Sequence, residues 1–408
     1  MKKTVIFIIL VSALNATTLK SMLSSTKVKN DLVLSKDLQV LSAKKELSAV
    51  NKSYYPTIDV GLNAQNLSPR SAMRPGSVYS LYAKLNYNIY DGGVKKYTKS
   101  QKHFELVSKV FEREWFLKSL SLAVVQDFYA IKSLDALKGS LISKKRAIQA
   151  ALKKAKVLYN AQMIDYAQLD RFKAEIENIN YNIEALNLQK ETLLGSLSVK
   201  VGKKIKNLGN SHFKKRKIAF SINDEIKAIL AKSSALNSAS SAIGATNRAK
   251  VNLSLEYDIN GYDRYDMFHP KGVDKQAKVG LNANIRVFDG GVVKERAQAA
   301  KLQAASIALE ARHKIKEQKN NFKIAKLRIK TIKSKIKSAK ATLKSATSYF
   351  NNIKDKYSAG LADESLFLEA LSQKTEALAE YKRSLNDLEI AYALYYYFGG
   401  KNLKGYIR

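Results

Sequence analysis

The sequence predicts a mainly helical fold that also carries membrane β-strands and is built from two tandem structural repeats. Three observations predict it. A short motif occurs twice, alternating apolar and polar residues precede each copy, and about 65 residues almost without Gly or Pro follow each copy. The motif is Tyr-Asp-Gly-Gly-Val at residues 90–94 and Phe-Asp-Gly-Gly-Val at residues 288–292, and 289 − 91 = 198. A period of this length indicates the duplication of a whole structural unit.

The same offset orders the rest of the chain. It relates Tyr159 to Tyr357, and it relates the Gly-Lys pair at residues 202–203 to the Gly-Lys pair at residues 400–401. Landmarks that share one register over this distance mean that the helices of the two repeats have equal length.

The N-terminus indicates export. Two lysines precede a short apolar run, residues 5–14, which ends in small residues, as in a secretory signal peptide. We predict a signal peptide over residues 1–16, cleaved after Ala13 or Ala16. An N-terminal anchor is the alternative, but a spanning helix needs roughly 20 apolar residues. The chain has no cysteine, which excludes a lipid-modified cysteine as anchor and fits an exported protein without disulfides.

We predict repeat 1 over residues 17–202 and repeat 2 over residues 222–408, each beginning with a helix. The segment between them, residues 203–221, is the least regular and most basic part of the chain. Its run Lys214-Lys215-Arg216-Lys217 has the composition of a nucleic-acid-binding segment. An exported protein meets no chromosome, so a solvated basic linker is the preferred interpretation.

Strict alternation predicts four strands, at residues 57–67, 78–90, 250–260 and 277–288. A half-buried hairpin of a soluble domain is the alternative for either pair alone. The long polar loop inside each pair is typical of the outer side of a membrane barrel, and the smallest such barrels have about eight strands. Four strands therefore require several subunits, and three subunits would supply twelve.

Helical periodicity predicts one helix over residues 94–158 and another over residues 292–356, each about 100 Å long at about 1.5 Å per residue. Breaks at about residues 159–165 and 357–363 turn each into a returning helix. Apolar residues recur at spacings of three and four, which predicts antiparallel helices packed as a coiled coil.

This order of strand, Asp-Gly-Gly turn, long helix, Tyr-x-Ala-Gly-Leu tip and returning helix, present twice, resembles the TolC family of outer-membrane efflux proteins. The resemblance covers nearly the whole mature chain. It implies a homotrimer in outer-membrane lipid, with a twelve-stranded β-barrel, four strands per chain, continuous with a long α-helical coiled-coil periplasmic tunnel. It also implies a channel-tunnel subunit that conducts substrates from a periplasmic adaptor (membrane fusion protein) and an inner-membrane transporter to the exterior, in efflux or type I secretion.

The resemblance assigns adaptor contact to the helix tips. The second tip, Ala359-Gly360-Leu361, matches the family motif, whereas the first, Ala161-Gln162-Met163, replaces the glycine. Asp165 suits an N-cap, with Gln168 completing a capping box, and Asp363 suits an N-cap alone.

In the family, carboxylates just beyond the second tip ring the closed end of the tunnel. Glu369 stands at one such position and Leu366 occupies the other, so Asp363 is the candidate substitute. An ordinary surface glutamate is the alternative interpretation of Glu369. The strand-to-helix turns are the matched residues Asp91, Gly92 and Gly93 in repeat 1 and Asp289, Gly290 and Gly291 in repeat 2.

The net charge is +36, from 71 Lys and Arg against 35 Asp and Glu. Such an excess suits nucleic acid or an anionic surface, but lysines spaced along helices, as from Lys314 to Lys330, also fit a solvated helix face. Lysines that line the tunnel and favour anionic cargo are a further hypothesis.

No enzyme, cofactor site, metal site or nucleic-acid partner is expected. The four histidines lack the spacing of metal ligands, and no phosphate loop or nucleophile elbow is present. A soluble coiled-coil scaffold that binds nucleic acid is one rival interpretation, opposed by the signal peptide and the strands. A periplasmic adaptor is the other, opposed by the two tandem hairpins.

Overall fold

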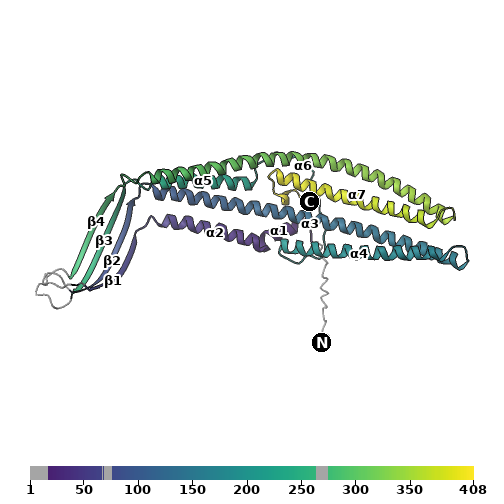
Figure 1. Ribbon diagram of the computed structural model, residues 1–408, viewed down its shortest axis with the longest axis horizontal. Helices are drawn as coiled ribbons and strands as arrows, with labels where there is room; N and C mark the ends of the chain where they lie inside the picture. Colours follow the sequence, from purple (N-terminus) through teal and green to yellow (C-terminus); the bar gives the residue numbers. More distant parts are fainter. Residues whose placement is uncertain (1–16, 67, 69–75, 263–273) are drawn as a thin grey trace, which may run out of the picture. The chain divides into compact units, whose positions relative to one another are not determined.

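The computed structural model describes residues 17–66, 68, 76–262 and 274–408, so the predicted signal peptide lies outside the described residues (Figure 1). The chain contains long helices and one small sheet. In order, the elements are α1 (Leu19–Lys29), α2 (Asp31–Lys52), β1 (Thr57–Asn66), β2 (Ser77–Tyr90), α3 (Val94–Asn160), α4 (Tyr166–Val201), α5 (Asp224–Gly244), β3 (Lys250–Tyr262), β4 (Lys275–Asn284), α6 (Val292–Ser358), α7 (Glu364–Phe398) and η1 (Leu403–Tyr406). In the part of the chain that the structure describes, no helix is both long and apolar enough to cross a membrane.

Two compact units divide the chain, and each draws on both sequence repeats. One comprises Met1–Lys36, Arg113–Asp224 and Ile315–Arg408, and the other comprises Asp37–Glu112 and Glu225–Lys314. The long helices α3 and α6, each 67 residues, contribute residues to both units. Their equal length agrees with the common register of the duplication.

The sheet lies in the second of these units and has the order β1-β2-β3-β4, with every neighbouring pair antiparallel. Its central pair joins the repeats, because β2 lies against β3 with Leu85 opposite Leu255. Within the described residues, the outer edges of β1 and β4 pair with no further strand.

The last strand is shorter than predicted. Alternation predicted a strand that continues to Phe288, but β4 ends at Asn284. Its partner β3 begins at Lys250, which lies opposite Asn284, so residues 285–288 have no backbone of β3 to pair with. Alternation reports the side-chain pattern, whereas a strand also needs partners for its N–H and C=O groups.

The single helix predicted before the first strand is two helices, separated at Asn30. The Asn30 Nδ2 donates to the carbonyl oxygens of Val199 (3.3 Å) and Lys200 (3.0 Å) near the end of α4. Its Oδ1 accepts from the N–H of Val33 (3.1 Å). One buried amide thus caps the start of α2 and satisfies the last carbonyls of α4. The chain leaves helical geometry there, with φ −84° and ψ 122°.

The basic linker is only partly solvated, which corrects the sequence-based expectation. Ile205 and Phe213 are buried, and the N–H of Phe213 donates to Glu389 Oε2 at 2.7 Å. The charged residues 215–217 are exposed, as expected. Apolar residues between the lysines dock the segment on α7, because burying them stabilises the fold while the ammonium groups stay in water.

Two hydrophobic clusters hold the first unit together. The larger surrounds Tyr396, whose ring stacks on Tyr406 with centroids 4.1 Å apart. The smaller lies near the helix tips, where α3, α4, α6 and α7 converge on Phe172 and Phe367. This second cluster fixes the position of the two tips in one packed group.

Candidate functional site

The two strand-to-helix turns share one hydrogen-bonding geometry. The Asp91 carboxylate accepts from the N–H groups of Gly93 (3.0 Å) and Lys95 (2.6 Å). Asp289 accepts the same pair of bonds, at 2.9 and 3.0 Å, from the residues two and four positions on. Each carboxylate satisfies free N–H groups at a helix N-terminus, where the helix dipole also favours a negative charge.

Asp289 has an additional partner. The Asn247 Nδ2 donates to its carboxylate at 2.7 Å. This hydrogen bond, followed by the one from the N–H of Val293, lowers the pKa of Asp289 below its ordinary value, because both stabilise the charged form.

The glycines of these turns adopt the left-handed conformation, with φ 73° and 92° at Gly92 and Gly93 and φ 67° and 86° at Gly290 and Gly291. This conformation favours glycine because it has no Cβ. At Gly92 a Cβ would also lie 2.7 Å from the Cβ of Arg248. The predicted turn residues therefore direct the chain from sheet to helix.

The first helix tip ends α3 with a defined motif. The N–H of Met163 donates to the carbonyl of Leu158 (2.9 Å), and the N–H of Gln162 donates to that of Tyr159 (2.8 Å). These six-to-one and five-to-two bonds make a Schellman motif. Gln162 occupies its left-handed position at φ 60°, and no other described residue except glycine has a positive φ.

The second tip repeats the motif 198 residues later. The N–H of Leu361 donates to the carbonyl of Lys356 (2.8 Å), and the N–H of Gly360 donates to that of Tyr357 (3.2 Å). Gly360 has φ 75°. All six predicted tip residues are exposed, namely Ala161, Gln162, Met163, Ala359, Gly360 and Leu361. The two tips thus present loops of the same backbone shape.

The returning helices begin differently from each other. Asp363 caps α7, since its carboxylate accepts from the N–H of Leu366 at 2.8 Å. The predicted capping box at Asp165 is wrong, because the side chain of this N-cap residue forms no cap hydrogen bond. The N–H of Gln168 instead donates to the backbone carbonyl of Asp165 at 3.1 Å.

The two predicted gate carboxylates, Glu369 and Asp363, differ in their hydrogen bonds. Glu369 is exposed on α7, and its Oε1 accepts from Gln373 Nε2 (3.1 Å) one turn along the same helix. Asp363 is already engaged by its cap bond. Leu366, at the second position where the resemblance predicts a carboxylate, is half-buried.

The sequence interpretation missed an ion pair between the two hairpins. Arg171 on α4 donates to Glu364 on α7 at 2.6 Å and to the hydroxyl of Ser365 at 3.2 Å. The Glu364 side chain is only 5% exposed, whereas that of Arg171 is 61% exposed. Burial, and secondarily the charge of Glu364, raises the pKa of the Tyr357 hydroxyl. No spacing rule connects residues 193 positions apart, so only the acidic first turn of α7 was a visible signal.

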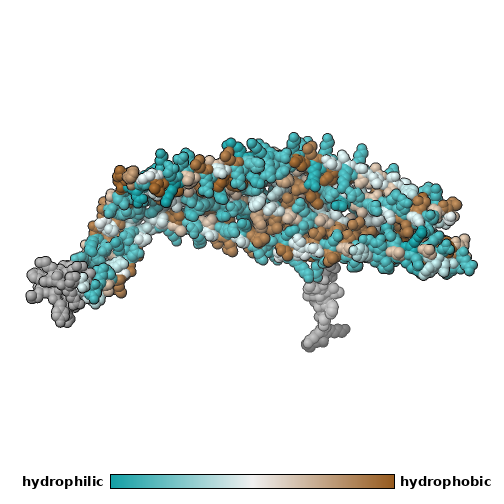
Figure 2. Space-filling view, in the orientation of Figure 1, coloured by the Kyte–Doolittle hydropathy of each residue, from teal (hydrophilic) through white to brown (hydrophobic). Residues whose placement is uncertain are grey.

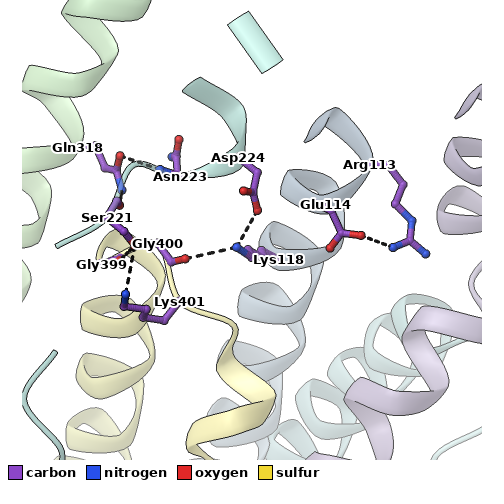
Figure 3. Close-up of polar contacts among 10 residues, drawn as sticks. All are labelled: Arg113, Glu114, Lys118, Ser221, Asn223, Asp224, Gln318, Gly399, Gly400 and Lys401. Atoms are coloured by element: carbon purple, nitrogen blue, oxygen red, sulfur yellow. Dashed lines mark hydrogen bonds and ion pairs between the residues drawn. The ribbon is translucent and has the colours of Figure 1, made fainter. Parts of the chain in front are cut away.

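A second unpredicted cluster lies where α3, α6 and the end of α7 meet the segment before α5 (Figure 3). The buried Gln318 donates to the carbonyls of Ser221 (3.0 Å) and Phe398 (2.8 Å) and accepts from the N–H of Asn223 (3.1 Å). One amide therefore satisfies three backbone groups, at the end of α7 and in the segment that leads into α5.

Lys118 completes this junction. Its Nζ lies 2.6 Å from the Asp224 carboxylate and donates to the carbonyl of Gly400 at 3.3 Å. Asp224 is buried. Folding therefore removes water from its carboxylate, and the ammonium group of Lys118 takes the place of that water. The junction joins the two repeats structurally. Within the described ranges, no three His, Asp or Glu side chains are grouped so as to hold a metal ion.

The second half of the chain is similar in sequence to a known family. Residues 223–399 match the family described as "Outer membrane efflux protein". Comparison with curated protein sequences found no match. The matched range covers the second repeat from α5 to the end of α7.

Solved structures of channels share the fold. The Campylobacter jejuni CmeC outer membrane channel superposes with a TM-score of 0.82 at 15% identity, over 95% of this chain and 86% of that one. The Vibrio cholerae outer membrane protein VceC gives 0.81 at 11% identity, over 94% and 96% of the chains. The Neisseria gonorrhoeae MtrE outer membrane channel in its open state gives 0.80 at 13% identity, over 94% and 89%.

The predicted fold class is confirmed for the single chain, which is mainly helical with a four-stranded antiparallel sheet and TolC-like in architecture. The family is one of transport proteins. Residues 223–399 thus match the outer membrane efflux protein family, and the described chain has the fold of solved outer membrane channels.

Proposed function

We propose that the chain is one subunit of a trimeric channel-tunnel that carries substrates from a periplasmic adaptor and an inner-membrane transporter across the outer membrane, in efflux or type I secretion. The subunit itself is not an enzyme, and transport energy comes from the transporter. The observation that carries this proposal is the sheet, which exposes apolar side chains and leaves both outer edges open.

The edge strands have an apolar face without protein cover. The exposed apolar residues alternate with polar ones and are Ile58, Val60 and Leu62 on β1 and Val279 and Leu281 on β4. In water such a face is unfavourable, but it suits hydrocarbon. Backbone groups at an open sheet edge need partners in lipid, and β1 of one copy supplies them to β4 of the next. Three copies then give a closed sheet of twelve strands.

The tips support contact with an adaptor. They are exposed, and Met163 and Leu361 present apolar side chains at their ends. Because both tips have the same backbone motif, three subunits offer six similar loops to the adaptor. Glu369, exposed on α7 beyond the second tip, is the carboxylate proposed to ring the closed end of the tunnel.

Planar-bilayer conductance of the detergent-purified protein tests the proposal, with a chemical crosslinking ladder on the same sample. We expect trimers and small stable conductance steps. Glu369→Ala should enlarge the steps, because it removes three charges from the constriction. The control is Glu376→Ala, an exposed glutamate two turns further from the tip on the same helix, which should leave the steps unchanged. Monomers that never insert would refute the channel, and equal effects of both variants would refute the role of Glu369.

A further inference from the structure

An uninterrupted row of lysines runs along one face of α6. The lysine row recurs at alternating spacings of three and four, which keeps its members on one helix face, and consists of Lys316, Lys319, Lys323, Lys326, Lys330, Lys333, Lys337, Lys340 and Lys344. All nine are exposed, and residues 318–354 contain no Asp or Glu. Figure 2 shows hydrophilic residues over much of α6.

No member of the lysine row forms an ion pair with another described residue. The lysine beside it behaves differently, since Lys335 lies 2.7 Å from Glu380 and 3.4 Å from Asp387 on α7. Lysines of this helix thus pair within the chain where a carboxylate is within reach.

A complementary row lies on α4. The acidic row consists of Asp170, Glu177, Glu184 and Glu191, at spacings of seven. All four are exposed, and on the same face Tyr181 and Leu188 are 72% and 71% exposed. Within the described chain, Glu177, Glu184 and Glu191 form no ion pair. A face that alternates carboxylates with large exposed apolar groups has the composition of an interface rather than of a solvated helix side.

The rows lie on opposite sides of one helical layer. In the first unit, Lys335 and Glu380 join α6 to α7. Asn386 donates to Ser133 at 3.0 Å and joins α7 to α3. Lys190 and Asp135, 2.6 Å apart, join α3 to α4. Beyond the tips, α6 and α4 are therefore the outer helices of the order α6-α7-α3-α4.

The rows also match in level along the helices. Asp135 meets Lys190, and Lys145 meets Asn180 at 2.5 Å, so α3 and α4 are aligned by these pairs. The positions of α6 that correspond to Asp135 and Lys145, 198 residues on, are Lys333 and Leu343. Both tips pack in one cluster, so corresponding positions lie at the same distance from the tips. Lys333 is then level with Glu191, and the same alignment sets Lys340 level with Glu184 and Lys344 close to Glu177.

We propose that α6 of one copy and α4 of a second copy form an interface in the assembly, in which Lys333, Lys340 and Lys344 pair with Glu191, Glu184 and Glu177. The inference rests on the proposed trimer, because rotation about an axis along the helices brings these two outer helices together without changing their level. Lysines before Lys333 lie beyond the end of the acidic row and take no part in it.

A groove beside the lysine row accommodates the aromatic residue of the facing copy. It has a volume of about 560 Å³ and is lined by Lys337, Lys340, Leu343, Thr347 and Tyr381, among others. By the same alignment Tyr181 of the second copy lies level with this groove. Its ring would cover the apolar stems while its hydroxyl meets polar groups, as aromatic residues do at the centres of interfaces.

The chain has no cysteine, so introduced cysteines report the contact without background. We would prepare the full-length double variant Lys340→Cys/Glu184→Cys, treat it with a short bismaleimide in detergent, and run a denaturing gel. Covalent dimers and trimers are expected. The matched control is Lys319→Cys/Glu184→Cys, which uses the same rows at a separation of about 31 Å along the helix and should give none. Equal crosslinking of both pairs, or of neither, overturns the interface.

Charge reversal gives a second, independent measurement. Glu184→Lys and Lys340→Glu should each raise the dissociation constant of the trimer about tenfold at low salt. Each reversal places two like charges at a contact that occurs three times per assembly. Combining the two should restore most of the loss. If the wild type is a trimer and neither reversal changes its dissociation, this interface is wrong and the channel proposal stands. If the wild type is not a trimer, the proposed function itself fails.

Discussion

Gln162 and Gly360 occupy the same left-handed position in two Schellman motifs that are 198 residues apart in the chain, at φ 60° and φ 75°. A residue with a Cβ is strained in this conformation by about 1 kcal/mol or more relative to glycine. The first tip therefore carries a strain that the second tip avoids. The strain belongs to the backbone, because a Cβ at Gly360 would meet nothing within 4 Å.

Replacing Gln162 by Gly should stabilise the first tip by about 1 kcal/mol. Hydrogen exchange of the Met163 amide, which donates to Leu158 when the motif is closed, should slow about fivefold. Gly360→Ala is the reciprocal variant and should accelerate exchange of the Leu361 amide by a similar factor. Unchanged exchange in both variants would show that the left-handed position costs nothing at these tips.

The ion pair between the hairpins should be sensitive to which partner is removed. Arg171→Met leaves the Glu364 carboxylate, 5% exposed, without its charged partner. We expect a loss of about 1 to 2 kcal/mol of unfolding free energy, a modest value because water screens the exposed guanidinium. Glu364→Gln should cost less, since a neutral amide is easier to bury. In a denaturant-unfolding double-mutant cycle the combined variant should lose less than the sum of the two. Strict additivity would mean that the pair contributes no coupling.

The pH dependence of stability should depend on Asp289. Its pKa is lowered in the folded state, chiefly by Asn247 and then by the N–H of Val293. The contribution of Asp289 to stability is therefore fully present at pH values above its ordinary pKa of 3.8. It is lost as the pH falls through the lower pKa of the folded state. Wild type should lose more stability between pH 5 and pH 2 than Asp289→Asn does, measured by thermal unfolding in detergent. Asp355→Asn, at an exposed position near the end of α6, should follow the wild type.

Features set by local sequence could be predicted, and the duplication allowed a feature of one repeat to be predicted in the other. The Asp-Gly-Gly turns have the expected positions because an aspartate followed by two glycines suits a helix start after a left-handed turn. The Gly-Lys pairs at 202–203 and 400–401 also proved equivalent. Each glycine adopts φ near 75°, and each pair ends a helix with Schellman bonds.

Features that depend on a distant partner could not be predicted. The end of β4 is set by where β3 begins, and the break at Asn30 is set by carbonyls 169 and 170 residues away. The pairing of Arg171 with Glu364 and the burial of Gln318 arise only when two repeats pack together. The capping box at Asp165 failed for a local reason, because a backbone carbonyl took the donor that the side chain was expected to bind.

The break at Asn30 offers the sharpest test of such long-range dependence. Asn30→Ala removes one cap bond and two bonds to carbonyls of α4 from a buried site, and we expect a loss of about 2 kcal/mol. Asn320→Ala, an exposed asparagine on α6, should change stability little.

Asn30→Asp separates the two roles of the amide. The carboxylate can still accept from the N–H of Val33, but it faces the carbonyls of Val199 and Lys200 with negative charge and no donor. At neutral pH this variant should therefore be less stable than Asn30→Ala, because the C-terminus of a helix disfavours an anion. Acidification should reverse the order, since the protonated acid donates one hydrogen bond to a carbonyl. Thermal unfolding of both variants at pH 7 and pH 4 measures this, and a constant order would mean that only the cap on α2 matters.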